Sequence, residues 1–279
     1  MRVIETIAQL RRQVADARRS GRRIGLVPTM GALHEGHASL IAQARAGSDA
    51  VIVTIFVNPI QFNNEEDLRL YPRTMEADAA LCESLGVDII FAPAVEEMYP
   101  MPLACAIDVG KLADHLCGAF RPGHFKGVAT VVMKLFQIVQ ADRAYFGEKD
   151  AQQLAVIRRL VADFNVPIEI VGVPTVRESD GLALSSRNRR LTPDDRKRAI
   201  ALYRALQAAE SQIAAGATDA AAIKRHAVTT VPQGEGLKVE YLEIVDPVDM
   251  QPLERVSGPV VIAGAMWVGG VRLIDNIRT

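Results

Sequence analysis

The chain is short of several features, and each shortage excludes a class of protein. Its 279 residues include only three cysteines, Cys82, Cys105 and Cys117, without CxxC spacing. Neither a disulfide framework nor a zinc knuckle is therefore predicted. No uninterrupted apolar run reaches the roughly 18 residues that a membrane-spanning helix needs, and the first residues lack the apolar core of a signal peptide. We expect a cytoplasmic protein without membrane contact.

The chain also has no large excess of positive or negative charge. The net charge is -1, from 32 basic and 33 acidic residues, which argues against nucleic acid as the main partner. Lysine is scarce, with seven against a large excess of arginine, so the position of each lysine is informative. Apolar residues make up 49% and charged residues 23%, which is typical of a globular protein. The length suffices for one large or two ordinary domains.

Apolar runs alternate with helical periods through the first two-thirds of the chain. The expected strands are Ile24–Val27, Ala50–Val57, Val87–Phe91, Arg143–Phe146 and Pro167–Val173. The expected helices are Gly36–Ala46, Arg73–Leu85, Gly127–Val139 and Asp150–Phe164. The strands are rich in Val and Ile without clean alternation, which is typical of strands covered by helices on both faces. The pattern predicts an α/β, Rossmann-like parallel sheet with ligands at the carboxyl ends of its strands.

The pattern changes after residue 176. Thr192 and Pro193 start an expected helix to Ala215, because they supply a cap and a proline at the first helical position. A helix at Asp219–Val231 and strands at Leu237–Val245 and Pro259–Val268 complete the predicted elements. We therefore predict a catalytic domain over residues 1–176 and a small α+β domain over residues 177–279.

Two of the five histidines, His34 and His37, lie where the first strand turns into a helix. The first turn of a helix carries unpaired N–H groups and the positive end of the helix dipole, so it attracts phosphate. Imidazoles at that position add donors that can follow charge as it develops on a reacting phosphate. A pair of surface histidines in a loop would look the same in isolation.

Three further loops follow strands and carry polar side chains. Lys149, in Gly147-Glu148-Lys149-Asp150, precedes a helix, where a cation is unusual unless it meets an anion. Gln61 and Gln153 are neutral and suit a hydroxy-carboxylate, although either alone is an ordinary surface residue. The run Ser185-Ser186-Arg187 is suited to closing over phosphates.

Other interpretations find less support. A zinc hydrolase helix needs two histidines four residues apart, and His34 and His37 are three apart. Gly25, Gly31 and Gly36 do not form GxGxxG, which disfavours a dinucleotide oxidoreductase. Two alternatives stay open: a nucleotidylyltransferase acting on a phosphate ester, which would prefer basic residues in place of the glutamines, and a module that only senses nucleotide.

The HxGH run resembles the signature of the nucleotidylyltransferase superfamily, which is related to class I aminoacyl-tRNA synthetases. Within it, the chain resembles the pantothenate synthetases (pantoate–β-alanine ligases) over nearly its whole length. The motifs that carry the likeness are Pro28–His37, Asn58–Gln61, Tyr71–Thr74, Arg121–Gly127, Gly147–Gln153 and Gly181–Asn188. Leu184 stands where many members have Met. The family implies an enzyme that joins (R)-pantoate to β-alanine through a pantoyl adenylate, releasing AMP and pyrophosphate.

The resemblance also implies roles for individual residues. His34 and His37 would stabilise the pentacoordinate phosphorus, with His37 as proton donor, and Lys149 would bridge the reacting phosphate. Gln61 and Gln153 would bind pantoate, and β-alanine would enter near Gln61. ATP would be bound by Met30, Gly31, Ala32, Leu33, His34, Glu35, Gly36, His37, Gly147, Glu148, Lys149, Asp150, the Val176 backbone, Leu184, Ser185, Ser186 and Arg187. Arg121 and His124 would assist these residues at the same site.

Beyond these residues, the family implies Mg²⁺ held between the phosphates of ATP without a named protein ligand, and a homodimer. It also implies that the C-terminal domain closes over the site.

Overall fold

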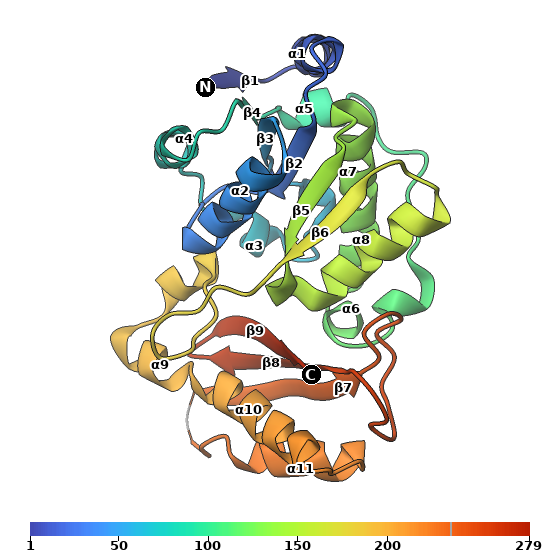
Figure 1. Cartoon of the computed structure of the whole chain (residues 1–279). Coiled ribbons are helices and arrows are strands. Elements are labelled where there is room, and N and C mark those ends of the chain that lie inside the picture. The colour runs from blue at the N-terminus through green and yellow to red at the C-terminus, as the bar shows by residue number, and fades with distance from the viewer. Residues whose placement is uncertain (235) are drawn as a thin grey trace. The chain divides into compact units, whose positions relative to one another are not determined.

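Six parallel strands form a sheet in the order β1-β4-β3-β2-β5-β6 in a computed structural model that describes residues 1–234 and 236–279 (Figure 1). The strands are β1 (Arg2–Ile4), β2 (Ile24–Thr29), β3 (Ala50–Ile55), β4 (Ile89–Phe91), β5 (Arg143–Gly147) and β6 (Glu169–Val173). The helices that accompany them are α1 (Ile7–Arg19), α2 (Glu35–Gly47), α3 (Glu65–Arg69), α4 (Met75–Ser84), α5 (Val95–Met98), α7 (His124–Val139) and α8 (Ala151–Asp163).

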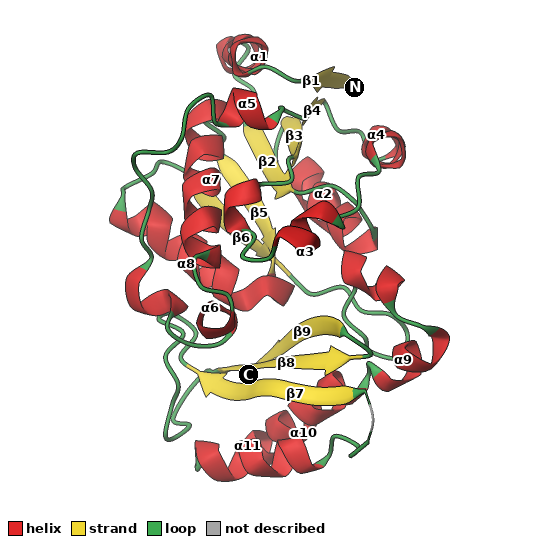
Figure 2. Ribbon diagram, turned by 180° about the vertical axis from the view of Figure 1, so that it is seen from behind, coloured by secondary structure: helices red, strands yellow, loops and turns green. Residues whose placement is uncertain are grey.

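Helices cover both faces of this sheet, as Figures 1 and 2 show from opposite sides. Val51, Ile52 and Val53 on β3 are all at most 1% exposed, although successive side chains point to opposite faces. Leu40 and Ile41 of α2 pack with Val27, Val51 and Val53 on one face. Burial on both faces explains why the strands read as continuous apolar runs, and it confirms the predicted α/β fold.

The strand order places a switch point between β2 and β5. From β2 the chain proceeds outward through β3 to β4, whereas β5 and β6 continue on the other side of β2. In sheets of this kind ligands bind outside the carboxyl ends of the strands at the switch point. The histidine loop after Thr29 and the turn after Gly147 both leave the sheet there.

A three-stranded antiparallel sheet, β7 (Leu237–Val245), β8 (Val261–Val268) and β9 (Val271–Arg278), belongs to a second compact unit. Its helices are α6 (Cys117–Phe120), α9 (Pro193–Arg198), α10 (Ala201–Ala214) and α11 (Ala220–Thr229). The core of this unit joins α10, α11 and the sheet through side chains such as Leu206, Ile223 and Ile262.

The two compact units are built from interleaved segments. The first contains Met1–Val109, Arg121–Gly147 and Val156–Pro174, and the second contains Gly110–Phe120, Glu148–Ala155 and Thr175–Thr279. Glu148–Ala155, which carries Lys149 and Gln153, therefore belongs to the second unit, together with most of the C-terminal part of the chain.

One expectation about local structure was wrong, and several elements were not predicted. The single helix expected up to Ala215 is interrupted between α9 and α10 at Ala199 and Ile200. Both residues keep right-handed helical angles and are buried, so tertiary packing sets the break where local propensity is uninterrupted. The expected elements also omitted β1, α1 and β9. The turn Gly269-Gly270, with positive φ at both residues, pairs β8 with β9 and is a strong hairpin signal in the sequence.

Candidate active site

The histidine loop lies between β2 and α2, and His34 caps the helix. The His34 backbone is extended, and its Nδ1 accepts a hydrogen bond from the Gly36 N–H at 3.1 Å. Nδ1 of His37 accepts from the His34 N–H at 3.3 Å, so the two residues form a reciprocal cap. Their ring centroids are 4.2 Å apart, tilted by 54°. The structure thus brings together the two histidines that the sequence singled out.

These two bonds assign the tautomers of both imidazoles. A ring nitrogen that accepts from a backbone N–H carries no proton, and the proton of a neutral imidazole is then on the other nitrogen. Both histidines therefore present Nε2–H as a donor. Two donors at the N-terminus of α2 suit an anion on which negative charge builds up.

A buried carboxylate holds the loop that precedes these histidines. Asp78 on α4 is 2% exposed and accepts from the Ala32 N–H at 2.9 Å and the Leu33 N–H at 2.8 Å. Thr74 Oγ1 donates to the same carboxylate at 3.1 Å. The loop needs this support because Gly31 and Ala32 both adopt positive φ, which is costly for alanine. Sequence reasoning missed Asp78.

A chain of hydrogen bonds orients the amide of Gln61, which is 8% exposed in the 3₁₀ helix η1 (Pro59–Gln61). Tyr99 Oη donates to Asn58 Oδ1 at 2.7 Å, and Asn58 Nδ2 donates to Gln61 Oε1 at 2.9 Å. Gln61 Nε2 therefore acts as the donor, and in the structure it contacts Met30 Sδ at 3.2 Å. The predicted pantoate residue and the predicted ATP loop thus adjoin.

Arg121 and His124 support the same 3₁₀ helix. Nε2 of His124 lies 3.0 Å from Arg121 Nη1, and its Nδ1 lies 2.9 Å from the Gln61 carbonyl oxygen. Because arginine only donates, His124 accepts at Nε2 and donates from Nδ1. The buried His124 ring thereby holds the backbone of Gln61.

The predicted residues of the second unit lie on two loops and on the first turn of α8. Glu148, Lys149 and Asp150 form the half-buried 3₁₀ helix η3 (Glu148–Asp150), which leads into α8 and half-buried Gln153. The Leu184 N–H donates to the Val176 carbonyl at 3.0 Å and so joins two predicted ATP-binding positions. Ser185 caps η4 (Ser186–Arg190), with its Oγ accepting from the Arg187 N–H at 3.2 Å.

The remaining predicted positions differ in exposure. Within Met30–His37, Gly31, Ala32 and Leu33 are buried, Met30 and Gly36 are half-buried, and Glu35 is exposed. Gly147, Val176, Leu184, Ser185, Ser186 and Arg187 are half-buried. In the first unit, the predicted residues are those of Met30–His37, Gln61 beside Met30, the supporting Arg121 and His124, and Gly147 at the end of β5. Those of the second unit lie on two loops and on the first turn of α8.

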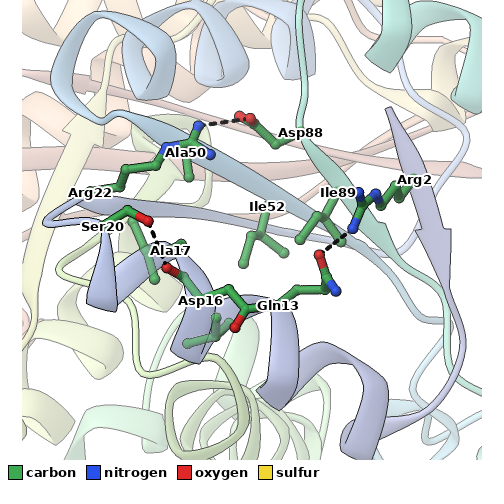
Figure 3. A pocket seen from close by; sticks show the side chains of 12 residues that line it. Arg2, Gln13, Asp16, Ala17, Ser20, Arg22, Ala50, Ile52, Asp88 and Ile89 are labelled. Atoms are coloured by element: carbon green, nitrogen blue, oxygen red, sulfur yellow. Dashed lines mark hydrogen bonds and ion pairs between the residues drawn. The ribbon is translucent and has the colours of Figure 1, made fainter.

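One hollow of the first unit lies away from these residues (Figure 3). It measures about 310 Å³ and is lined by Arg2, Ile24, Ala50 and Ile89, which begin or lie at the amino ends of β1 to β4. Arg22 on its wall pairs with Asp88 at 2.9 Å. Because ligands of parallel sheets bind at the carboxyl ends, this hollow is not the candidate site.

A metal cage and a membrane-spanning helix are both absent from the described residues, 1–234 and 236–279. Among them, no three His, Cys, Asp or Glu side chains gather as a metal cage. No described helix is long and apolar enough to cross a membrane.

Comparison with known proteins decides the family. The model of the family described as pantoate-beta-alanine ligase matches residues 2–278. The chain belongs to the pantoate–β-alanine ligase family. The pantothenate synthetase of Moorella thermoacetica is 53% identical over 277 residues, covering 99% of this chain and 98% of the relative. Pantothenate synthetase 1 of Bradyrhizobium diazoefficiens is also 53% identical, over 278 residues, with coverage of 99% and 98%.

Solved structures of this ligase family share the fold. The pantothenate synthetase of Thermus thermophilus superposes with a TM-score of 0.93 at 47% identity, covering 99% of both chains. The pantoate–β-alanine ligase of Francisella tularensis, solved with β,γ-ATP and β-alanine, has a TM-score of 0.81 at 37% identity, with coverage of 99% and 97%. As a family member the chain is a ligase that forms pantothenate, which decides against a zinc hydrolase, an oxidoreductase and a nucleotide sensor.

Proposed function

We propose that the chain condenses (R)-pantoate with β-alanine in two ATP-dependent half-reactions. A carboxylate oxygen of pantoate attacks the α-phosphorus of ATP, and the bond from that phosphorus to the bridging oxygen breaks, releasing pyrophosphate. The neutral amine of β-alanine then attacks the acyl carbon of pantoyl adenylate. The acyl–oxygen bond breaks, AMP leaves and the nitrogen loses a proton. The Francisella tularensis ligase, solved with β,γ-ATP and β-alanine, supports ATP and β-alanine as two of these substrates.

The pair of Nε2–H imidazoles at the start of α2 carries the proposal. A carboxylate nucleophile needs no general base, so the first step demands donors that stabilise charge on phosphorus. The His34 and His37 bonds to the backbone place the proton of each neutral ring on Nε2. The Nε2–H of His37 then donates a hydrogen bond to the departing phosphate oxygen as that oxygen takes up charge.

The amide of Gln61 is suited to pantoate because its donor nitrogen is set by the Asn58 and Tyr99 hydrogen bonds. A neutral donor binds a hydroxy acid without pairing its carboxylate so tightly that the nucleophile is lost. Gln153 is proposed as the second pantoate residue, and β-alanine is proposed to take the space by Gln61 once pyrophosphate has left.

Lys149 is proposed to neutralise the reacting phosphate, because two anions must meet in the first step. The remainder of Met30–His37, Gly147, Glu148, Asp150 and the Val176 backbone are proposed to bind ATP. Leu184, Ser185, Ser186 and Arg187 are proposed to close on its phosphates. Arginine supplies a planar, permanently charged donor for phosphate oxygens.

ATP is proposed to enter as its Mg²⁺ complex. The described residues offer no cluster of three candidate ligands, so no step is assigned to a protein-held ion and the phosphates are proposed as the ligands. The homodimer stays a prediction of the family resemblance.

The fate of isotopic oxygen tests the proposal. With pantoate labelled by ¹⁸O in its carboxylate, ATP and β-alanine, one ¹⁸O should appear in AMP. The enzyme should also exchange labelled pyrophosphate into ATP when pantoate is present and β-alanine is absent. Formation of ADP and labelled inorganic phosphate would show an acyl phosphate and refute the adenylate. Pantothenate formation without any nucleotide cleavage would refute ATP dependence.

A further inference from the structure

The C-terminal strand β9 carries two adjacent buried polar residues that hold loops of the second unit. Asp275 and Asn276 are 5% and 6% exposed. Asn276 Nδ2 donates to the carbonyl oxygen of Glu148 and to that of Lys149, both at 2.9 Å. A polar side chain buried to this extent is stabilised only where its partners are in place.

Chemistry fixes the orientation of this amide. Both neighbouring atoms are carbonyl oxygens, so only the NH₂ side of Asn276 can face them, with one hydrogen for each oxygen. The two carbonyls flank the Cα of Lys149. Their attachment to one side chain restricts the peptide planes on both sides of that residue, and hence the direction in which its side chain leaves the backbone.

Asp275 ties a second loop to the same strand. Arg177 forms two bonds to the Asp275 carboxylate, at 2.6 and 2.9 Å, and a third to the Asn276 carbonyl oxygen at 3.1 Å. The guanidinium also lies 4.1 Å from the centre of the Tyr203 ring. Arg177 directly follows Val176, whose carbonyl accepts from Leu184. Neighbouring residues of β9 thus anchor both loops that carry predicted ATP-binding residues in this unit.

We propose that Asn276 is a positioning residue for Lys149, acting through the Glu148 and Lys149 carbonyls, and that Asp275 fixes the Val176 loop in the same frame. This inference rests on the proposed function of Lys149. The strand contributes no group to the reacting atoms. Its effect is to keep the ammonium of Lys149 where the phosphate reacts, since small displacements of a catalytic group are costly.

Two substitutions of Asn276 distinguish the loss of its amide donors from the loss of its packing volume. Asn276→Ala removes the amide, and Asn276→Leu removes its donors but keeps similar volume in a buried place. Pantoate-dependent ATP–pyrophosphate exchange should fall about tenfold to a hundredfold in both variants. Recovery of exchange in Asn276→Leu would show that packing alone matters and would overturn the proposal.

Leu273→Ala is the matched control, because Leu273 is a buried core residue of the same strand. It should lower Tm at least as much as Asn276→Ala while exchange measured well below Tm is retained. If Leu273→Ala and Asn276→Ala lose exchange equally, the effect is general destabilisation and the proposal fails.

A double-mutant cycle supplies the decisive readout. In a Lys149→Ala background, Asn276→Ala should cause little further loss of exchange, because a residue that acts through Lys149 has nothing left to position. Full additivity of the two losses would overturn the inference. If Asn276→Ala exchanges pyrophosphate as fast as the active unaltered enzyme, the inference about Asn276 is overturned and the proposed function stands. Absence of exchange by the unaltered enzyme would remove the proposed function and the inference together.

Discussion

Replacing Asp78 by alanine should destabilise the first unit strongly, although the residue lies outside the predicted motifs. Its carboxylate accepts two backbone N–H groups, at 2.9 and 2.8 Å, from Ala32 and Leu33, which are themselves 0% and 5% exposed. A hydrogen bond to a charged group contributes about 1.5–3 kcal/mol, and a buried donor left without partner costs a similar amount. The expected loss is therefore about 3–6 kcal/mol for the two bonds.

This loss should appear in the free energy of unfolding from urea titration and in Tm. For a chain of this size about 4 kcal/mol corresponds to a decrease in Tm of roughly 8–16 °C. The matched control is Asp163→Ala, because Asp163 pairs with Arg159 on the surface of α8, at 48% and 59% side-chain exposure. Such pairs contribute less than about 1 kcal/mol.

The Asp78 variant should also form pantothenate slowly at temperatures where it is folded, because the loop that leads to His34 loses its anchor. If the free energies of unfolding of Asp78→Ala and Asp163→Ala differ by less than about 1 kcal/mol, the buried bonds do not carry the energy assigned to them. If stability falls as expected but the turnover number is unchanged, the carboxylate supports the fold and not the histidine loop.

Three further outcomes are expected. Lys149→Ala should slow pantoate-dependent pyrophosphate exchange by about 10²–10³ with Tm unchanged, as for loss of a charge-stabilising donor; undiminished exchange would refute its role. Gly127→Ala should raise the KM for pantoate, because the new Cβ would lie 2.7 Å from the Cα of Gln61, whereas Gly258→Ala, with nothing within 4 Å, should be neutral. Burial, with a smaller contribution from a nearby carboxylate, raises the pKa of Cys82 from 9.0 to about 12. Because this folded-state pKa exceeds the unfolded value, its contribution to stability is complete below pH 9 and is lost as pH rises toward 12. Unfolding free energies measured between about pH 8 and pH 11 should therefore fall more steeply with pH for the unaltered chain than for Cys82→Ala, and equal slopes would contradict the shift.

Much of the first sheet could be predicted because its signals are local. The apolar run at Ile24–Val27 and the helix that follows His34 lie within about 20 residues of each other, and capping groups and side-chain periodicity suffice to identify them. The antiparallel strand β9 was not predicted, although the Gly269-Gly270 dipeptide is a hairpin signal and both of its residues have positive φ. The break between α9 and α10 carries no local signal, since packing around Ala199 and Ile200 decides it.

The amino-acid sequence by itself determined the chemistry that this protein can offer: two imidazoles at a helix start, a lysine after a strand, and neutral amides for a hydroxy acid. Tertiary structure alone decided how these groups are held. Asp78 reaches Ala32 across 46 residues, and Asn276 reaches Glu148 across 128. The physical reason is that a buried donor or acceptor must find a partner wherever the fold brings one, and no local pattern along the chain specifies which partner that is.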